Sequence, residues 1–73
     1  MNNNIWKGRW KQISGEVQKQ WGDLTDQELF RVDGDRKKLE GLIQEKYGIT
    51  QELIRKKLDA IEKKFLDVAT KLE

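Results

Sequence analysis

Apolar side chains in the first part of the chain recur with the period of an α-helix. Their spacings are four, three, four and four residues, and at about 100° per residue such positions fall within one arc of about 80°. The pattern therefore predicts an amphipathic helix near residues 4–21, with residues 1–4 frayed at the polar start of the chain. Gly22 follows where a left-handed C-cap is expected. The stripe consists of Trp6, Trp10, Ile13, Val17 and Trp21.

A short second helix is predicted from Asp26 to about Val32. Thr25 and Glu28 have the spacing of a capping box, in which each residue satisfies a backbone N–H at the start of the helix. Leu24 and Leu29 stand on either side of this cap at the spacing of a hydrophobic staple.

A third helix is predicted after the turn signal at residues 33–35, with Asp35 as its cap. Gly48 marks its end, because glycine adopts the left-handed conformation of a C-cap without steric cost. Its apolar face consists of Leu39, Leu42, Ile43 and Tyr47.

The last part of the chain predicts one long helix from about Thr50 to the end, since no glycine or proline interrupts it. Its stripe is Ile54, Leu58, Ile61, Phe65, Val68 and Leu72. A small domain covers only part of such a helix, so Phe65, Val68 and Leu72 are a candidate partner surface. The alternative is that the first helix runs antiparallel along the whole length and buries this strip. The first case predicts a weak homodimer and the second a monomer.

These elements predict an all-α fold, a small four-helix bundle of two packed helical hairpins. A helix, a glycine stop and a capped helix occur twice along the chain, which suggests an approximate internal duplication. The expected core is Trp10, Ile13, Val17, Trp21, Leu29, Leu39, Leu42, Ile43, Tyr47, Ile54, Leu58 and Ile61.

Composition limits the chain to one small domain over residues 1–73. Of the 73 residues, 36% are apolar and 38% are charged, and separate cores need longer chains. The net charge of +2 gives only a weak attraction to nucleic acid or anionic lipid. Apolar residues never run beyond two in a row, which excludes a membrane span of about 20 residues and the apolar core of a signal peptide. We therefore expect a soluble, cytoplasmic protein.

The residue types present argue against catalysis. The chain has no cysteine and no histidine, so the thiolate nucleophile, the commonest general base and the commonest metal ligand are missing. The carboxylates near the second helix lack the spacing of a calcium loop, because Glu28 would stand where that loop requires glycine. We expect no catalytic residue, no cofactor-binding residue and no metal site.

Two basic clusters supply candidate phosphate contacts, at Arg36, Lys37, Lys38, Arg55 and Lys56. The alternative is a solvated helix face, because acid-before-base pairs such as Glu52 and Lys56, or Asp59 and Lys63, stand four residues apart.

Three glycines, Gly8, Gly15 and Gly41, lie inside the predicted helices, opposite the apolar stripes. Each costs about 1 kcal/mol relative to alanine in a helix. Either another segment approaches these helix backs closely, or the helices are left marginal, and the sequence does not distinguish the two.

Several short motifs together make the chain resemble the CsbD-like family of small bacterial stress-response proteins. They are WKQ at residues 10–12, a helical glycine at 15, WG-x-LTD at 21–26 and G-x-IQE-x-YG at 41–48. The resemblance implies a small domain of two packed helical hairpins, in a cytoplasmic protein of general stress without an established enzymatic activity. The chain departs from the family pattern after Thr50, where a strongly patterned helix replaces a more polar tail.

The expected function is therefore that of a non-enzymatic stress-response protein that acts by binding or protection, with an unidentified macromolecular partner and no cofactor. The alternative is a weak nucleic-acid-binding module built on helical hairpins. Adsorption to a membrane surface is disfavoured, because acidic residues interrupt the basic stretches.

Overall fold

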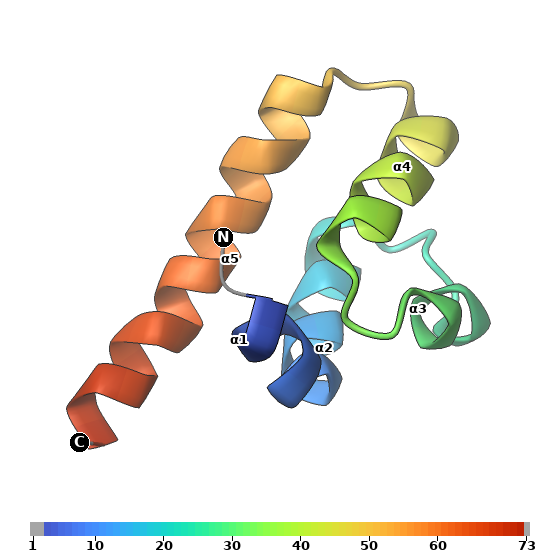
Figure 1. The fold of residues 1–73 in the computed structure, drawn as a ribbon. Helices are drawn as coiled ribbons and strands as arrows, with labels where there is room; N and C mark the ends of the chain where they lie inside the picture. The colour runs from blue at the N-terminus through green and yellow to red at the C-terminus, as the bar shows by residue number, and fades with distance from the viewer. Residues whose placement is uncertain (1–2, 73) are drawn as a thin grey trace.

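The structure, a computed structural model, describes the backbone of residues 3–72 and the side chains of residues 5–66. The described backbone is all-α, as the sequence predicts, and consists of five helices with no strand (Figure 1). The helices are α1 (Asn3–Gly8), α2 (Trp10–Gln20), α3 (Asp26–Val32), α4 (Arg36–Tyr47) and α5 (Gln51–Leu72).

The first predicted helix is broken at Arg9 into α1 and α2. Arg9 has φ −119° and ψ 22°, which is not helical, although its N–H still donates to the carbonyl of Ile5 at 3.0 Å. Gly8 precedes the break and weakens the helix there, since glycine is a poor helix former. The break lets α1 contact both α2 and α5.

One hydrophobic core joins all five helices. Nine of the twelve residues expected in the core are buried, while Trp10, Leu42 and Tyr47 are partly buried against it. The prediction missed three buried residues, Trp6, Leu24 and Val32. Trp6 was left out because it lies beside the polar start of the chain, yet it is fully buried.

The helices are not arranged as two equivalent packed hairpins. α5 packs on α4, α1 and α2, whereas α3 packs chiefly on α4. Figure 1 shows α5 along one side of the molecule and α3 at the opposite side, with α2 and α4 between them. The four-helix bundle with an internal duplication is therefore not confirmed.

The two halves of the sequence echo also end their first helices differently. Gly48 takes the left-handed C-cap conformation with φ 63°, as predicted. Gly22 does not: α2 ends at Gln20, its C-cap is Trp21 with φ −130°, and Gly22 has no positive φ. The prediction of a left-handed cap at Gly22 was wrong, because the Leu24 N–H closes this turn by donating to the Trp21 carbonyl at 3.2 Å.

The caps predicted for α3 and α4 are confirmed. Thr25 and Glu28 form a complete capping box at the start of α3. Asp35 accepts a hydrogen bond from the N–H of Lys38 at 3.3 Å and so caps α4. These caps satisfy N–H groups that a helix start leaves without partners.

The turn between α3 and α4 requires glycine for two reasons. Gly34 has φ +80°, and a β-carbon at this position would lie 2.8 Å from the Cα of Lys7 and 3.0 Å from the carbonyl oxygen of Trp6. Only glycine allows α1 to lie so close to this turn. By contrast, a β-carbon on Gly8, Gly15 or Gly41 would meet nothing within 4 Å, so these three glycines weaken their helices rather than admit a neighbour.

Candidate functional site

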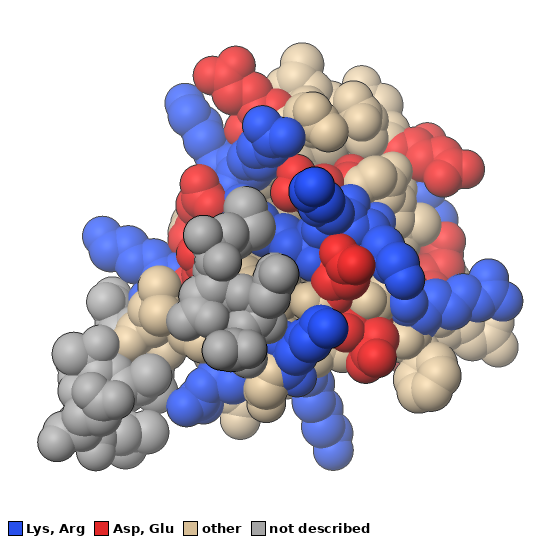
Figure 2. All heavy atoms as spheres, viewed as in Figure 1, with Lys and Arg blue, Asp and Glu red and all other residues tan. Residues whose placement is uncertain are grey.

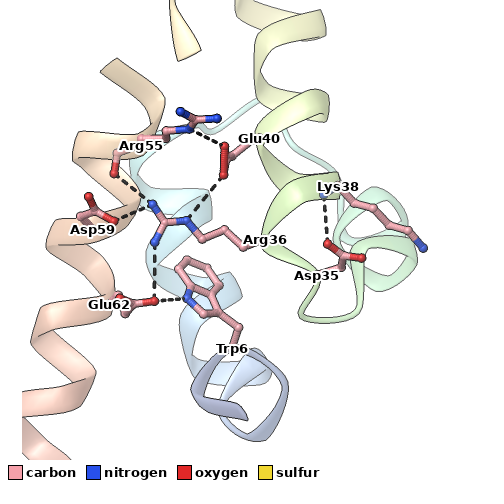
Figure 3. Close-up of polar contacts among 8 residues, drawn as sticks. All are labelled: Trp6, Asp35, Arg36, Lys38, Glu40, Arg55, Asp59 and Glu62. Atoms are coloured by element: carbon pink, nitrogen blue, oxygen red, sulfur yellow. Dashed lines mark hydrogen bonds and ion pairs between the residues drawn. The ribbon is translucent and has the colours of Figure 1, made fainter. Parts of the chain in front are cut away.

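A buried ion cluster holds α4, α5 and α1 together, and it is centred on Arg36 (Figure 3). Arg36 is only 2% exposed. Its Nη2 donates to Asp59 Oδ1 at 2.6 Å and to the Arg55 carbonyl at 3.2 Å, both on α5. Its Nη1 lies 3.5 Å from Glu62 Oε1, and its Nε lies 3.7 Å from Glu40 Oε2. We call Arg36 with its four polar partners and Trp6 the Arg36 cluster.

Trp6 completes this cluster from α1. Its indole N–H donates to Glu62 Oε1 at 2.6 Å, and the Arg36 guanidinium carbon lies 5.5 Å from the centre of the indole ring. A guanidinium at this distance from a tryptophan face gains cation–π attraction. Because the Trp6 and Lys7 backbone packs on Gly34, the turn before α4 sets the position of both Trp6 and Arg36.

The Arg36 cluster has a structural role, because it joins three helices through buried charges. Arg55 donates from Nε to Glu40 Oε1 at 3.2 Å, so the buried Glu40 contacts two guanidinium groups. Two of the Arg36 nitrogens, Nε and Nη1, make no hydrogen bond with the described residues, so the geometry is not ideal. A buried cation is costly to isolate from its carboxylates, and this ties the three helices to one arrangement. Among the described residues, no group of three or more ligand side chains could hold a metal ion.

The structure brings two of the five candidate phosphate contacts together, since Arg36 and Arg55 both contact Glu40. Arg36 is buried and paired with carboxylates, so its guanidinium is not at the surface, and a phosphate contact there stays a prediction. Arg55 is engaged with Glu40. Lys37 is exposed on α4, whereas Lys38 and Lys56 are exposed and line two different hollows of the surface. On the face shown in Figure 2, basic side chains lie among acidic ones.

The candidate partner surface near the end of α5 is described only at Phe65. That side chain is partly buried and packs against the core. The side chains of Val68 and Leu72 lie outside the described residues. In Figure 1 the C-terminal turns of α5 extend past the other helices. None of the described helices is both long and apolar enough to cross a bilayer.

A second surface feature, which the sequence did not reveal, lies on α3 and α4. Phe30 is 83% exposed on α3. Phe30 and Arg31 line one hollow together with Asp26 and Gln27. Arg31 also lines a second hollow of about 190 Å³, here called the α3–α4 hollow, whose other lining residues are Glu28, Val32, Lys38 and Leu42. A sequence signal did exist: Phe30 directly follows the staple residue Leu29, so it points away from the apolar side of the helix.

Hydrogen bonds from α2 hold α3 in place. The Trp10 indole N–H donates to the carbonyl of Leu29 at 3.0 Å, and the Gln18 amide donates to the carbonyl of Leu24 at 3.1 Å and to Asp26 Oδ1 at 2.8 Å. These bonds join α2 to α3 and to the loop before it. The short helix is therefore presented as a rigid element.

Glu28 links α3 to α4 on the rim of the α3–α4 hollow. The Lys46 ammonium donates to Glu28 Oε1 and to the carbonyl of Asp23, the latter at 2.8 Å. The hydrogen bond from Lys46, together with the backbone hydrogen bond from Thr25, lowers the pKa of Glu28 below its ordinary value of 4.5. Its charge is therefore already neutralised by a partner on this rim.

Comparison with known proteins places the chain among bacterial relatives. Residues 4–56 match the family described as CsbD-like. A UPF0337 protein of Bordetella pertussis is 54% identical over 52 residues, which cover 71% of this chain and 79% of that relative. The UPF0337 protein YjbJ of Escherichia coli O6:H1 is 42% identical over 64 residues, covering 88% of this chain and 93% of the relative. A UPF0337 protein of Xanthomonas axonopodis pv. citri is 37% identical over 67 residues, covering 92% of this chain and 97% of the relative.

No solved structure matches this chain. The names of these three relatives state no activity, substrate or partner. The family match ends at residue 56, so most of α5 lies beyond it. Since the match covers more than half of the sequence, and the relatives align over most of their own length, the chain belongs to the CsbD-like family.

Proposed function

We propose that this chain is a non-enzymatic, cytoplasmic stress-response protein of bacteria that acts by binding another macromolecule and protecting it. Membership of the CsbD-like family supports the stress association, which the resemblance in sequence implies. The observation that supports binding is Phe30, a large apolar side chain of α3 that is 83% exposed and lines a hollow with Asp26, Gln27 and Arg31. Scattered exposed apolar residues are common, but an aromatic side chain on a rigid element is typical of interaction surfaces.

The interior chemistry supports binding rather than catalysis. A catalytic acid or base must be within hydrogen-bond reach of a substrate. In the Arg36 cluster, Glu40 and Glu62 both lie against Arg36, and Glu62 also accepts the indole N–H of Trp6. These carboxylates serve helix packing.

A competition experiment tests the proposed function. The gene is deleted from the source bacterium, and the wild-type chain, an empty locus or a Trp21→Ala variant is restored. Trp21 is 4% exposed, and truncating a buried tryptophan costs about 3–5 kcal/mol, so this variant serves as an unfolded control. Under osmotic or starvation stress we expect the wild-type strain to outgrow the other two, and without stress we expect no difference. Equal growth of all three strains under stress contradicts the proposal.

A further inference from the structure

Three charged side chains line the α3–α4 hollow, and the two of them without an ion pair among the described residues are positive. Glu28 on its rim is bound by Lys46 and by the capping box of α3. Arg31 and Lys38 are exposed and form no ion pair within the described part of the chain. Arg31 also lines the hollow that Phe30 lines, together with Gln27 and with Asp26, whose carboxylate accepts a hydrogen bond from Gln18. Arg31 therefore stands between the exposed ring and the α3–α4 hollow.

The floor between these charges is apolar. Val32 is 5% exposed, and Leu42 is partly buried against the core. Both line the α3–α4 hollow. The result is an apolar depression with two exposed cations on its rim and an aromatic ring next to it.

The size of the α3–α4 hollow points to a side chain as its occupant. Its volume of about 190 Å³ is below the roughly 300–1,000 Å³ of small-molecule sites. A membrane surface offers no projecting group to fill a depression between two helices. A nucleic-acid base stacks on a flat aromatic face, which Phe30 offers but the aliphatic floor of the α3–α4 hollow does not.

Charge argues against a second copy of this chain on the same face. A two-fold contact brings equal patches together, so Arg31 and Lys38 of one copy would approach those of the other. Like charges placed together across an interface disfavour that pairing. An acidic partner has the complementary charge.

We propose that Phe30, Arg31, Val32, Lys38 and Leu42 form a docking surface for a short acidic segment of a partner protein. The segment inserts an apolar side chain into the α3–α4 hollow and packs a second one on Phe30, while its carboxylates meet Arg31 and Lys38. The hydrogen bonds that fix α3 prepare this surface before binding, which lowers the ordering cost. This inference rests on the proposed function and names the class of partner.

Binding is measured by fluorescence anisotropy with the full chain and a labelled synthetic peptide. The probe carries leucine and phenylalanine at helical spacing and glutamate at its other positions, and its twin carries lysine in place of every glutamate. We expect the acidic probe to bind and the basic twin to bind at least about tenfold more weakly. Amide resonances of labelled protein should shift at residues 27–32 and 38–42. Equal binding of the two probes, or shifts elsewhere, overturns the proposal.

Matched variants separate the apolar and the charged contributions. Phe30→Ala should weaken binding of the acidic probe about tenfold. Leu53→Ala, which changes another exposed apolar residue, should leave this binding unchanged. Arg31→Glu with Lys38→Glu should reverse the preference toward the basic twin. Lys57→Glu with Lys63→Glu gives the same net charge on exposed positions of α5 and should retain the acidic probe. Circular dichroism checks that each variant is folded, and loss of binding in the α5 pair as well overturns the proposal.

Other occupants are tested in the same series. Flotation with vesicles of anionic and neutral lipid, titration with a single-stranded oligonucleotide, and sedimentation equilibrium of the chain alone are compared for wild type and Phe30→Ala. A Phe30-dependent response to vesicles, oligonucleotide or self-association, without one to the acidic probe, overturns the inference. The proposed function would still stand if the wild-type chain gave a growth advantage under stress. Conversely, a chain that binds the acidic probe but gives no advantage under stress refutes the function alone.

Discussion

Replacing Arg36 by methionine removes a buried charge while keeping an unbranched side chain against Trp6. Arg36 is 2% exposed and has three carboxylates within 4 Å. The bond to Asp59 is the shortest, but that carboxylate is 65% exposed and contributes little because water screens it. Glu40 and Glu62, at 6% and 16% exposure, lose the Arg36 charge where water replaces it poorly, and they keep only Arg55 and the Trp6 indole N–H, respectively, as the partners described above.

The expected cost of Arg36→Met is about 3–5 kcal/mol, the range for breaking a buried ion pair by removing one partner. A domain of this size has a total stability of only about 3–5 kcal/mol, so the variant should be largely unfolded at room temperature. A second change, Glu40→Leu, should restore part of this loss, because it removes the carboxylate left inside. The exposed neighbour provides the control: Lys37→Met should change stability by less than about 0.5 kcal/mol.

Urea denaturation followed by far-ultraviolet circular dichroism measures these differences without relying on the fluorescence of Trp6. The reasoning is refuted if Arg36→Met costs less than about 1 kcal/mol, the size of an exposed ion pair. It is refuted equally if Arg36→Met with Glu40→Leu is less stable than Arg36→Met alone, since the cost would then arise from lost packing and not from an unpaired charge.

Three further predictions concern single positions. Gly48→Ala should lower the free energy of unfolding by about 1–2 kcal/mol, because Gly48 has a left-handed backbone. Gly34→Ala should lower it further, because the added β-carbon also meets the backbone of α1. Equal losses for the two variants in thermal unfolding would contradict that close approach. Gly41→Ala, with open space around the added carbon, should raise the free energy of unfolding by about 0.5–1 kcal/mol, and a loss would mean that the helix back is in contact. Because the pKa of Glu28 is lowered in the folded protein, the stabilising contribution of this carboxylate is complete above pH 4.5 and is lost as the pH falls through the folded pKa. Glu28→Gln should therefore lower the free energy of unfolding at neutral pH. It should also make that free energy fall less steeply in acid.

The oligomeric state gives one more prediction. Since Phe65 packs against the core, Phe65→Glu should destabilise the fold, and the wild-type chain should sediment as a monomer. A concentration-dependent dimer that Phe65→Glu dissolves without loss of helix content would instead show that the end of α5 is a partner surface.

The parts of the fold that the sequence predicted are those governed by local patterns. α3, α4 and α5 begin and end close to where capping residues and apolar spacing place them. The break at Arg9 escaped prediction, because the apolar stripe runs through it without a change of period. Gly8 weakens the helix locally, and tertiary contacts add to this effect, because Trp6 packs near α5 and against the turn at Gly34.

The candidate site was less predictable, because burial of a polar residue depends on distant partners. Arg36 begins a basic run that is typical of a solvated face, yet its partners Asp59 and Glu62 come from α5. Asp59 was expected to pair with Lys63 four residues away, but it pairs with Arg36. Phe30 was overlooked, although its place directly after the staple residue Leu29 indicates that it points away from the apolar side of α3.

The central claim is that the chain protects stressed cells through a folded binding surface. The most direct measurement is growth competition under stress between deletion strains that carry the wild-type chain, Phe30→Ala with Arg31→Glu, or the control Leu53→Ala with Lys57→Glu, at equal protein levels. The account predicts that the first variant falls behind like an empty locus, while the control keeps pace with the wild type. An advantage for the wild type that Phe30→Ala with Arg31→Glu fully retains would contradict the surface, and no advantage for the wild type would contradict the function itself.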